Sequence, residues 1–110
     1  MKRTILIVDD EENIRLSLKG GLEDEGFATV LASCGEDALK IIEGQEIDLV
    51  LLDIWMPGKD GLQVLEELHA NGYALPVIIM TGHGTIETAV KATRLGAVDF
   101  VEKPLDLNKI

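Results

Sequence analysis

The chain has 110 residues, a length that suits one compact domain, because two domains of that combined length would each bury too little surface. Hydrophobic residues make up 46% and charged residues 27%, the balance of a soluble globular protein rather than of a disordered or low-complexity segment. The formal net charge of −10 argues against direct nucleic-acid binding, which requires a basic surface facing the phosphates.

Five segments have the composition of β-strands. Four short, nearly continuous apolar runs predict strands that are buried on both faces of a sheet. In chain order these runs are Ile5–Val8, Leu49–Leu52, Val77–Met80 and Phe100–Val101. Ala28–Ala32 is smaller and partly polar, which is typical of an edge strand.

Four amphipathic helices are predicted between these strands, from apolar residues spaced three and four apart. The residues that carry this spacing are Ile14, Leu18 and Leu22; Ala38, Leu39, Ile41 and Ile42; Leu62, Leu65 and Leu68; and Ile86, Ala89, Val90 and Thr93. A glycine follows each set, at Gly26, Gly44, Gly72 and Gly96, where we expect the helix to end.

Strands that alternate with helices run parallel with right-handed crossovers, so the pattern predicts an α/β fold with a doubly wound, five-stranded parallel sheet. Residues 1–110 show no internal repeat or linker and are expected to form one domain. A fifth helix should begin after Lys103-Pro104, and the sequence stops there. We therefore expect a truncated fifth helix and the N-terminal part of a longer protein.

Polar residues follow four of the predicted strands. In an open parallel sheet, ligands bind outside the carboxyl ends of the strands. The residues at those ends are Asp9-Asp10-Glu11-Glu12, Asp53, Thr81-Gly82 and Lys103. Carboxylates that lie together repel one another unless a pKa is raised or a hard cation binds, and Mg²⁺ is the cation that fits best.

This set of groups meets the requirements of aspartyl phosphorylation. Asp9 and Asp10 would hold the metal, Asp53 would attack a phosphoryl group, and Thr81 and Lys103 would receive its oxygens. Each feature also has a purely structural interpretation: the acidic run as a helix N-terminus, and the others as turn or loop residues. Their coincidence at four strand ends favours the chemical interpretation.

Other kinds of site are disfavoured. Gly82-His83-Gly84 lacks the Lys-Ser/Thr pair of a phosphate-binding loop, and the single cysteine, Cys34, has no partner for a disulfide or metal site. His69 is expected to be solvated on a helix. The apolar runs are far shorter than the roughly 20 residues that span a bilayer, and the N-terminus does not resemble a signal peptide. We therefore expect a cytoplasmic protein that is not in the membrane.

Four stretches together resemble the receiver domain of bacterial two-component response regulators, over nearly the whole chain. They are Ile7–Glu11, Asp53–Gly61, Met80–Gly84 and Lys103-Pro104. The stretch from Gly82 to Lys103 is most similar to receivers of sigma-54-dependent transcription activators. The resemblance implies the strand order 2-1-3-4-5.

The resemblance also implies roles for individual residues. Asp53 would be the phospho-acceptor and would share Mg²⁺ with Asp9, Asp10 and the backbone carbonyl of Trp55. The phosphoryl donor would be a sensor histidine kinase, and the target an attached output domain or a downstream protein, with a transcriptional output.

Further positions concern switching. Thr81 would be the switch hydroxyl, Lys103 the phosphoryl-binding lysine, and Phe100 the aromatic residue whose rotamer follows Thr81, without the hydroxyl of the tyrosine found in many relatives. Family members join the equivalents of Lys103 and Pro104 by a cis peptide. Trp55 and His83 flank the route of water to the phosphoryl group, so we expect them to set the lifetime of the phosphorylated state.

Two other functions remain open beside a phosphorylation-dependent switch, which would not be an enzyme acting on external substrates. A phosphohydrolase with an aspartyl-phosphate intermediate usually needs an acid-base carboxylate two residues after the nucleophile, and that position is Trp55. An interaction domain that no longer accepts phosphate is the other alternative, although all five chemical positions carry competent residues. A homodimer is a possible assembly of the switch.

Overall fold

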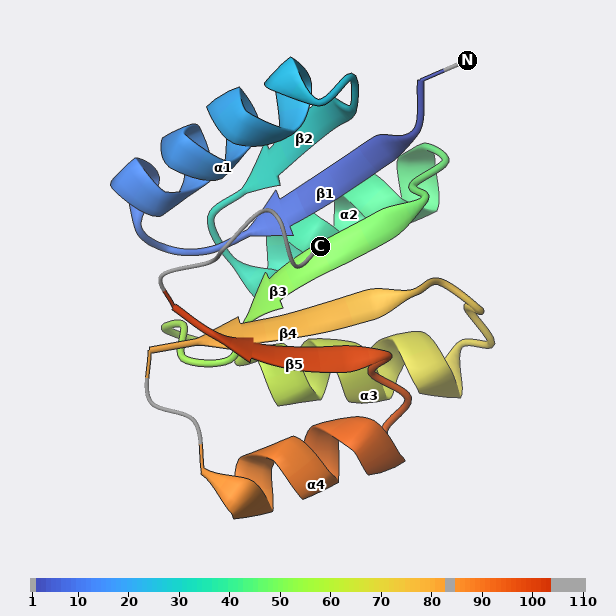
Figure 1. Cartoon of the computed structure of the whole chain (residues 1–110). Helices are drawn as coiled ribbons and strands as arrows, with labels where there is room; N and C mark the ends of the chain where they lie inside the picture. Colours follow the sequence, from blue (N-terminus) through green and yellow to red (C-terminus); the bar gives the residue numbers. More distant parts are fainter. Residues whose placement is uncertain (1, 83–84, 104–110) are drawn as a thin grey trace.

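The computed structural model describes residues 2–82 and 85–103 and confirms the alternation of strands and helices (Figure 1). The elements in chain order are β1 (Thr4–Val8), α1 (Glu12–Asp24), β2 (Ala28–Ala32), α2 (Gly35–Gly44), β3 (Leu49–Asp53), α3 (Gly61–Ala70), β4 (Val77–Thr81), α4 (Ile86–Arg94) and β5 (Asp99–Glu102). All neighbouring strands are parallel, and their order is β2-β1-β3-β4-β5, as expected. The predicted fifth helix lies outside the described residues.

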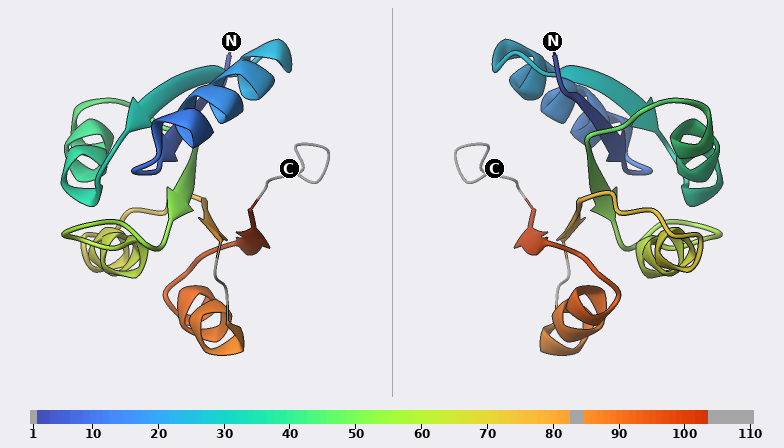
Figure 2. Two further views of the ribbon diagram at one scale, coloured as in Figure 1. Left: turned by 90° about the vertical axis from the view of Figure 1, so that its left-hand side faces the viewer. Right: turned by 90° about the vertical axis from the view of Figure 1, so that its right-hand side faces the viewer.

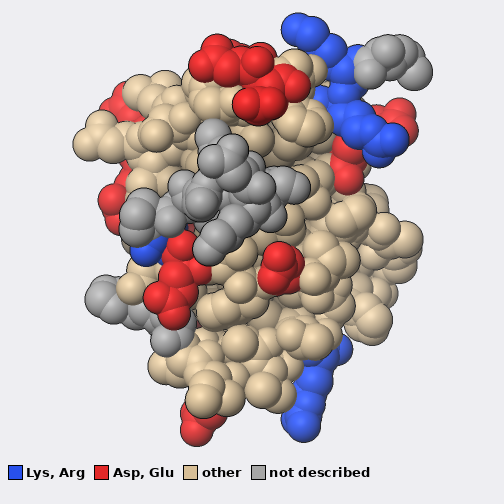
Figure 3. All heavy atoms as spheres, in the orientation of Figure 1, with Lys and Arg blue, Asp and Glu red and all other residues tan. Residues whose placement is uncertain are grey.

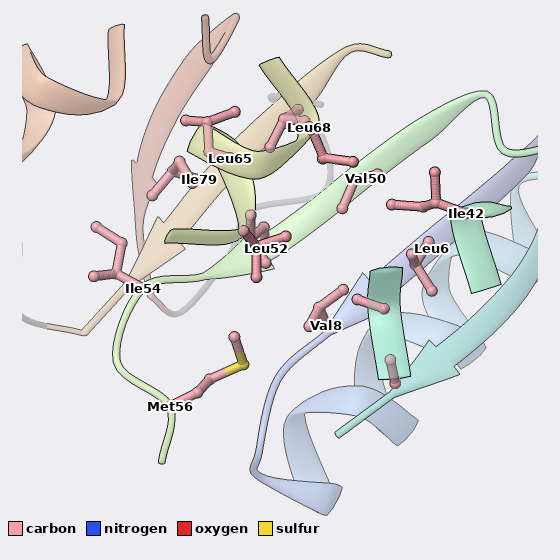
Figure 4. Close-up of a cluster of buried hydrophobic side chains, with 14 of the residues drawn as sticks. Leu6, Val8, Ile42, Val50, Leu52, Ile54, Met56, Leu65, Leu68 and Ile79 are labelled. Atoms are coloured by element: carbon pink, nitrogen blue, oxygen red, sulfur yellow. The ribbon is translucent and has the colours of Figure 1, made fainter. Parts of the chain in front are cut away.

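Helices cover both faces of the sheet, with α1 on the side opposite α2 and α3 (Figure 2). Alternate residues of each strand point to opposite faces, so the buried side chains form two clusters. The larger cluster joins the sheet to α2, α3 and α4, and Figure 4 shows many of its members. The smaller cluster joins the other face to α1 and includes Ile5, Ile7, Leu18, Leu22, Leu51 and Met80.

The two edge strands differ in how well the sequence predicted them. β2 pairs with β1 alone, which confirms the edge position expected from its composition. The prediction that Phe100–Val101 is buried on both faces is wrong, because β5 pairs with β4 alone and both residues are only half-buried. Asp99 and Glu102 at its ends are exposed, so the apolar stretch is too short to form a central strand.

Three of the four predicted helix-ending glycines form the same hydrogen-bonded turn. After α1, Gly26 donates to the Glu23 carbonyl and Phe27 to the Leu22 carbonyl, and the ends of α3 and α4 repeat this pattern. The glycines concerned have φ angles of 94° (Gly26), 79° (Gly72) and 104° (Gly96). Gly44 is instead the last residue of α2, and the chain leaves the helix in an extended conformation at Gln45.

The surface shown in Figure 3 carries several separate groups of acidic residues, and its basic residues do not form a continuous area. This distribution agrees with the high negative net charge of the sequence. None of the helices in the described part of the chain combines the length and the apolar character needed to cross a lipid bilayer.

Gly61, the first residue of α3, packs directly against the end of β3. Its amide donates to the Ile54 carbonyl at 2.9 Å. A Cβ atom at this position would lie 2.2 Å from the carbonyl oxygen of Asp53 and 2.9 Å from Cα of Ile54. The absence of a side chain at Gly61 therefore lets α3 begin beside the strand end that carries Asp53.

Gly61→Ala should lower the free energy of unfolding by about 2 to 4 kcal/mol, because the clash is with backbone atoms that cannot move aside cheaply. Gly20→Ala is the matched control, since Gly20 lies inside α1 and the added Cβ would have no atom within 4 Å apart from the neighbouring helix backbone. That control should raise stability by about 0.5 to 1 kcal/mol through helix propensity. Urea unfolding measures both, and equal stabilities of the Gly61 variant and the wild-type protein would contradict the close-packing argument.

Candidate functional site

The strand register brings the predicted site residues to one edge of the sheet. Asp9 follows β1, whose Val8 pairs with Leu52 of β3, and Asp53 is the last residue of β3. Thr81 ends β4, and Lys103 follows β5. The strands all point in the same direction, so these residues meet where the arrowheads of Figure 1 end.

Three carboxylates form the centre of this edge. Asp9 and Asp53 are buried, with 0% and 3% of their surface exposed, whereas Asp10 faces solvent. One oxygen from each can be chosen so that all three lie within 4.8 Å of one another. Buried and exposed oxygen ligands in such a group suit a hard divalent cation that is bound by protein on one side and open to solvent on the other.

Lys103 supplies the positive charge beside these carboxylates. Its Nζ lies 2.7 Å from Oδ2 of Asp9 and 3.4 Å from Oδ1 of Asp53. Oδ2 of Asp9 is completely buried, and the Lys103 ammonium faces it. Three carboxylates beside a single ammonium offer more oxygen ligands than that ammonium can neutralise, so the donor set fits a bound cation.

The backbone holds Lys103 in place. Its amide donates to the Thr81 carbonyl at 2.8 Å, which extends the pairing of β4 and β5 by one residue. Burial alone would lower the pKa of the Lys103 ammonium, but its contacts with Asp9 and Asp53 outweigh burial and raise that pKa. Lys103 therefore remains charged beside the carboxylates at neutral pH.

Asp53 has an unusual acidity. Burial raises the pKa of its carboxyl group from 3.8 to about 6. The negative charges of Asp9 and, more weakly, Asp10 act in the same direction, and the Lys103 ammonium opposes them. Asp53 is consequently ionised at neutral pH but is held in an environment that disfavours its charge, so a cation bound beside it would relieve an existing electrostatic cost.

The acidic run at residues 9–12 belongs partly to the site and partly to the start of α1. Asp9 and Asp10 belong to the site, while Glu11 occupies the N-cap position of α1 without a side-chain capping bond and Glu12 lies in the first turn. The Glu11 amide donates to Oδ1 of Asp9 at 2.9 Å, so the start of the helix also orients the buried carboxylate. The chemical and the structural interpretations of the run each apply to half of it.

Arg15 is a further residue of the site that was not predicted from the sequence. Its guanidinium donates to the backbone carbonyl of Asp9 at 2.8 Å and so ties α1 to the loop that carries Asp9 and Asp10. A basic residue so near the N-terminus of a helix is unfavourable for the helix dipole, and this was the available signal that Arg15 has another partner.

The structure describes some of the residues that were expected to influence switching and the lifetime of the phosphorylated state. Trp55 lies two residues beyond Asp53, and 51% of its surface is exposed. Phe100 is half-buried and packs against the larger apolar cluster, on the strand next to the one that Thr81 ends. His83 and the Lys103-Pro104 peptide bond lie outside the described residues, whereas His69 is exposed on α3 as expected.

The raised pKa of Asp53 predicts how stability depends on pH. Between pH 3.8 and about 6 the folded protein keeps the Asp53 proton while the unfolded chain has released it. The native state then binds more protons, so the free energy of unfolding falls as pH rises through this window.

Asp53→Asn cannot ionise and should therefore be more stable than wild type by about 1 to 3 kcal/mol at pH 7 in EDTA. The difference should shrink towards pH 4. Urea unfolding at several pH values measures it, with Asp24→Asn on the exposed end of α1 as the control that should show no such pH dependence. A stability difference that stays constant from pH 4 to pH 7 would mean that Asp53 does not titrate in this way.

Comparison with known proteins agrees with this geometry. The chain is 47% identical over 108 residues to an NtrX-like response regulator of Rickettsia felis, covering 96% of this chain and 23% of the relative. It is 42% identical over 112 residues to the nitrogen assimilation regulatory protein NtrX of Azorhizobium caulinodans, covering 100% of this chain and 25% of the relative. The chain thus spans about a quarter of the length of these relatives.

Solved structures are similar in the same region. The receiver domain of NtrX from Brucella abortus superposes with a TM-score of 0.88 at 47% identity, over 96% of this chain and 89% of that one. A CheY-like receiver domain protein from Methanospirillum hungatei gives a TM-score of 0.93 at 32% identity, over 99% and 87% of the two chains. A family model of the response regulator receiver domain matches residues 5–110. The chain therefore belongs to the response regulator receiver domain family.

Proposed function

We propose that this domain is a phosphorylation-dependent switch in which Asp53 accepts a phosphoryl group from a sensor histidine kinase, with Mg²⁺ bound beside it. The observation that carries the proposal is the placement of a buried, poorly stabilised carboxylate between two further aspartates and one lysine. Family membership supports a role in phosphorylation-dependent signalling.

The chemical step is a transfer to the Asp53 carboxylate. One oxygen of Asp53 attacks the phosphorus atom, the bond between phosphorus and the donor atom breaks, and the donor leaves with that electron pair. An acyl phosphate remains on Asp53. Only an ionised carboxylate can attack, and a pKa of about 6 leaves most of the Asp53 population ionised at pH 7.

The other groups would offset the charge that accumulates during transfer. Lys103, at 3.4 Å from Asp53, is placed to contact a phosphoryl oxygen once the group is on Asp53. Mg²⁺ would be held by Asp9, Asp10, Asp53 and the Trp55 carbonyl and, when bound, would neutralise negative charge on the phosphoryl oxygens. Asp9 would then exchange its close contact with Lys103 for the metal, which leaves the ammonium available to the phosphoryl group.

The signal would leave the site along β4 and β5. The Thr81 hydroxyl would bind a phosphoryl oxygen, and the half-buried Phe100 on the neighbouring strand would follow its movement. Beyond them, α4 exposes Ile86 and Val90, apolar side chains that an output domain or a second copy of the chain can contact. Relatives described as nitrogen assimilation and transcriptional regulators support a transcriptional output.

A phosphohydrolase acting on external substrates is less well supported. The position where such an enzyme needs its acid-base carboxylate holds Trp55, whose side chain is half-exposed and has no acidic group. The carboxylates of the described residues that do lie near Asp53 are those of Asp9 and Asp10, which the cation would occupy.

Incubation with acetyl phosphate and Mg²⁺ tests the proposal, because a small donor needs no kinase. Intact-mass measurement should show a gain of one phosphoryl group on wild type and on the control Asp24→Asn, and none on Asp53→Asn, which keeps the shape but not the attacking charge. Omission of Mg²⁺ should slow labelling by at least about 100-fold. Equal labelling of the Asp53 variant would assign the phosphoryl group to another residue.

Trp55 should control how long the phosphorylated state lasts, because a bulky, half-exposed indole two residues beyond Asp53 would hinder the approach of water to the phosphoryl group. Trp55→Asn should speed loss of phosphate by about tenfold, since a smaller polar side chain admits a water and can orient it. Loss of phosphate after removal of the donor gives the rate. Tyr73→Asn, a change at a half-exposed aromatic residue between α3 and β4, is the control and should leave the rate unchanged. If the phosphorylated state of the Trp55 variant lasts as long as that of wild type, Trp55 does not control its lifetime.

A further inference from the structure

The loop between β3 and α3, residues 54–60, has to hold a defined shape for the site to work. It begins directly after Asp53 and contains Trp55, whose backbone carbonyl is the proposed fourth metal ligand. Its two ends are fixed: the Ile54 carbonyl accepts from the Gly61 amide at 2.9 Å, and Asp60 forms a capping box with Gln63 of α3. Met56 is buried in the larger apolar cluster (Figure 4).

The turn of the loop is held from outside by Glu36, in the first turn of α2. The Lys59 amide donates to Oε1 of Glu36 at 3.3 Å. At Gly58, a Cβ atom would lie 3.6 and 3.8 Å from the two carboxylate oxygens, so the Glu36 carboxylate sits against both residues of the turn. Gly58 has a φ of 76°, a conformation that glycine adopts without the strain other residues would meet.

A second contact shows that α2 and this loop are closely fitted. A Cβ atom on Gly35 would lie 3.0 Å from the Lys59 carbonyl oxygen and 2.6 Å from a methyl carbon of Val64 in α3. The helix N-terminus therefore approaches the loop backbone as near as the absence of a side chain allows. The same short stretch of α2 thus contacts both the amide and the carbonyl of Lys59.

We propose that Glu36 is a positioning residue that fixes the turn of the β3–α3 loop and thereby the direction of the Trp55 carbonyl. Glu36 is exposed and does not itself reach the carboxylate cluster. Its effect passes through the Lys59 amide and the loop backbone, so it acts on the affinity of the site for Mg²⁺. This inference rests on the proposed function, because it assumes that the site binds Mg²⁺.

Three variants separate the hydrogen bond from the charge. Glu36→Ala removes the acceptor and the charge, Glu36→Gln removes the charge and keeps an acceptor oxygen, and Asp37→Ala removes the neighbouring charge from the same helical turn. Trp55 is the single tryptophan, so its fluorescence reports on this loop. Quenching by acrylamide without Mg²⁺ measures how firmly the loop is held, and calorimetric titration measures Mg²⁺ affinity independently of the fluorophore.

Glu36→Ala should weaken Mg²⁺ binding by about three- to tenfold, the effect of one net hydrogen bond, and should change the accessibility of Trp55 to acrylamide. Glu36→Gln and Asp37→Ala should stay within about twofold of wild type, because an exposed charge alone contributes little. Urea unfolding should give Glu36→Ala and Asp37→Ala similar stabilities, which separates loop positioning from general destabilisation.

Two outcomes would overturn the inference: equal effects of Glu36→Ala and Asp37→Ala on quenching and Mg²⁺ affinity, or equal losses in Glu36→Ala and Glu36→Gln. Failure of the wild-type protein to bind Mg²⁺ would instead contradict the proposed function. In that case the quenching measurement, made without Mg²⁺, still decides whether Glu36 holds the loop.

Discussion

Two buried carboxylates and one partly buried ammonium lie together at the carboxyl ends of the strands, and this imbalance of charge governs the site. Asp9 and Asp53 share Lys103, so one negative charge is left without a partner in a place that solvent barely reaches. The raised pKa of Asp53 is the direct expression of that cost. In the proposed function, a bound cation would lower this electrostatic cost, and a transferred phosphoryl group would add negative charge at the same place.

The sheet makes this arrangement unavoidable once the strands are parallel. β1 and β3 are adjacent and in register, so the residues that follow Val8 and Leu52 must lie side by side. β4 and β5 run in the same direction on the other side of β3 and bring Thr81 and Lys103 to the same edge. That polar residues gather at one edge could be predicted from the sequence, because apolar runs, helical spacing and the polar residue after each run are local signals. Which strands are neighbours was implied only by the resemblance to receiver domains.

What could not be predicted depends on tertiary neighbours. The half-burial of β5 was missed, because Phe100 and Val101 alone resemble part of a buried strand; its edge position was implied by the strand order that the family resemblance supplied, which periodicity does not encode. Arg15 and Glu36 act on backbone groups that are distant in sequence or across an interface between elements, at Asp9 and Lys59. Hydrogen bonds from a side chain to a remote backbone atom leave no pattern in the sequence beyond an unusual charge at a helix start.

The uneven burial of the elements has a dynamic consequence. β1 and β3 are packed on both faces, whereas among its described residues α4 buries only Ala92, and β5 lies at an edge. Local opening of a protein starts where apolar contacts are few. The α4–β5 region can therefore open transiently, exposing its amides to hydrogen exchange, while the strands that carry Asp9 and Asp53 open only with the whole domain. Lys103 directly follows β5, so the positively charged partner of the buried carboxylates belongs to the less stable part of the molecule.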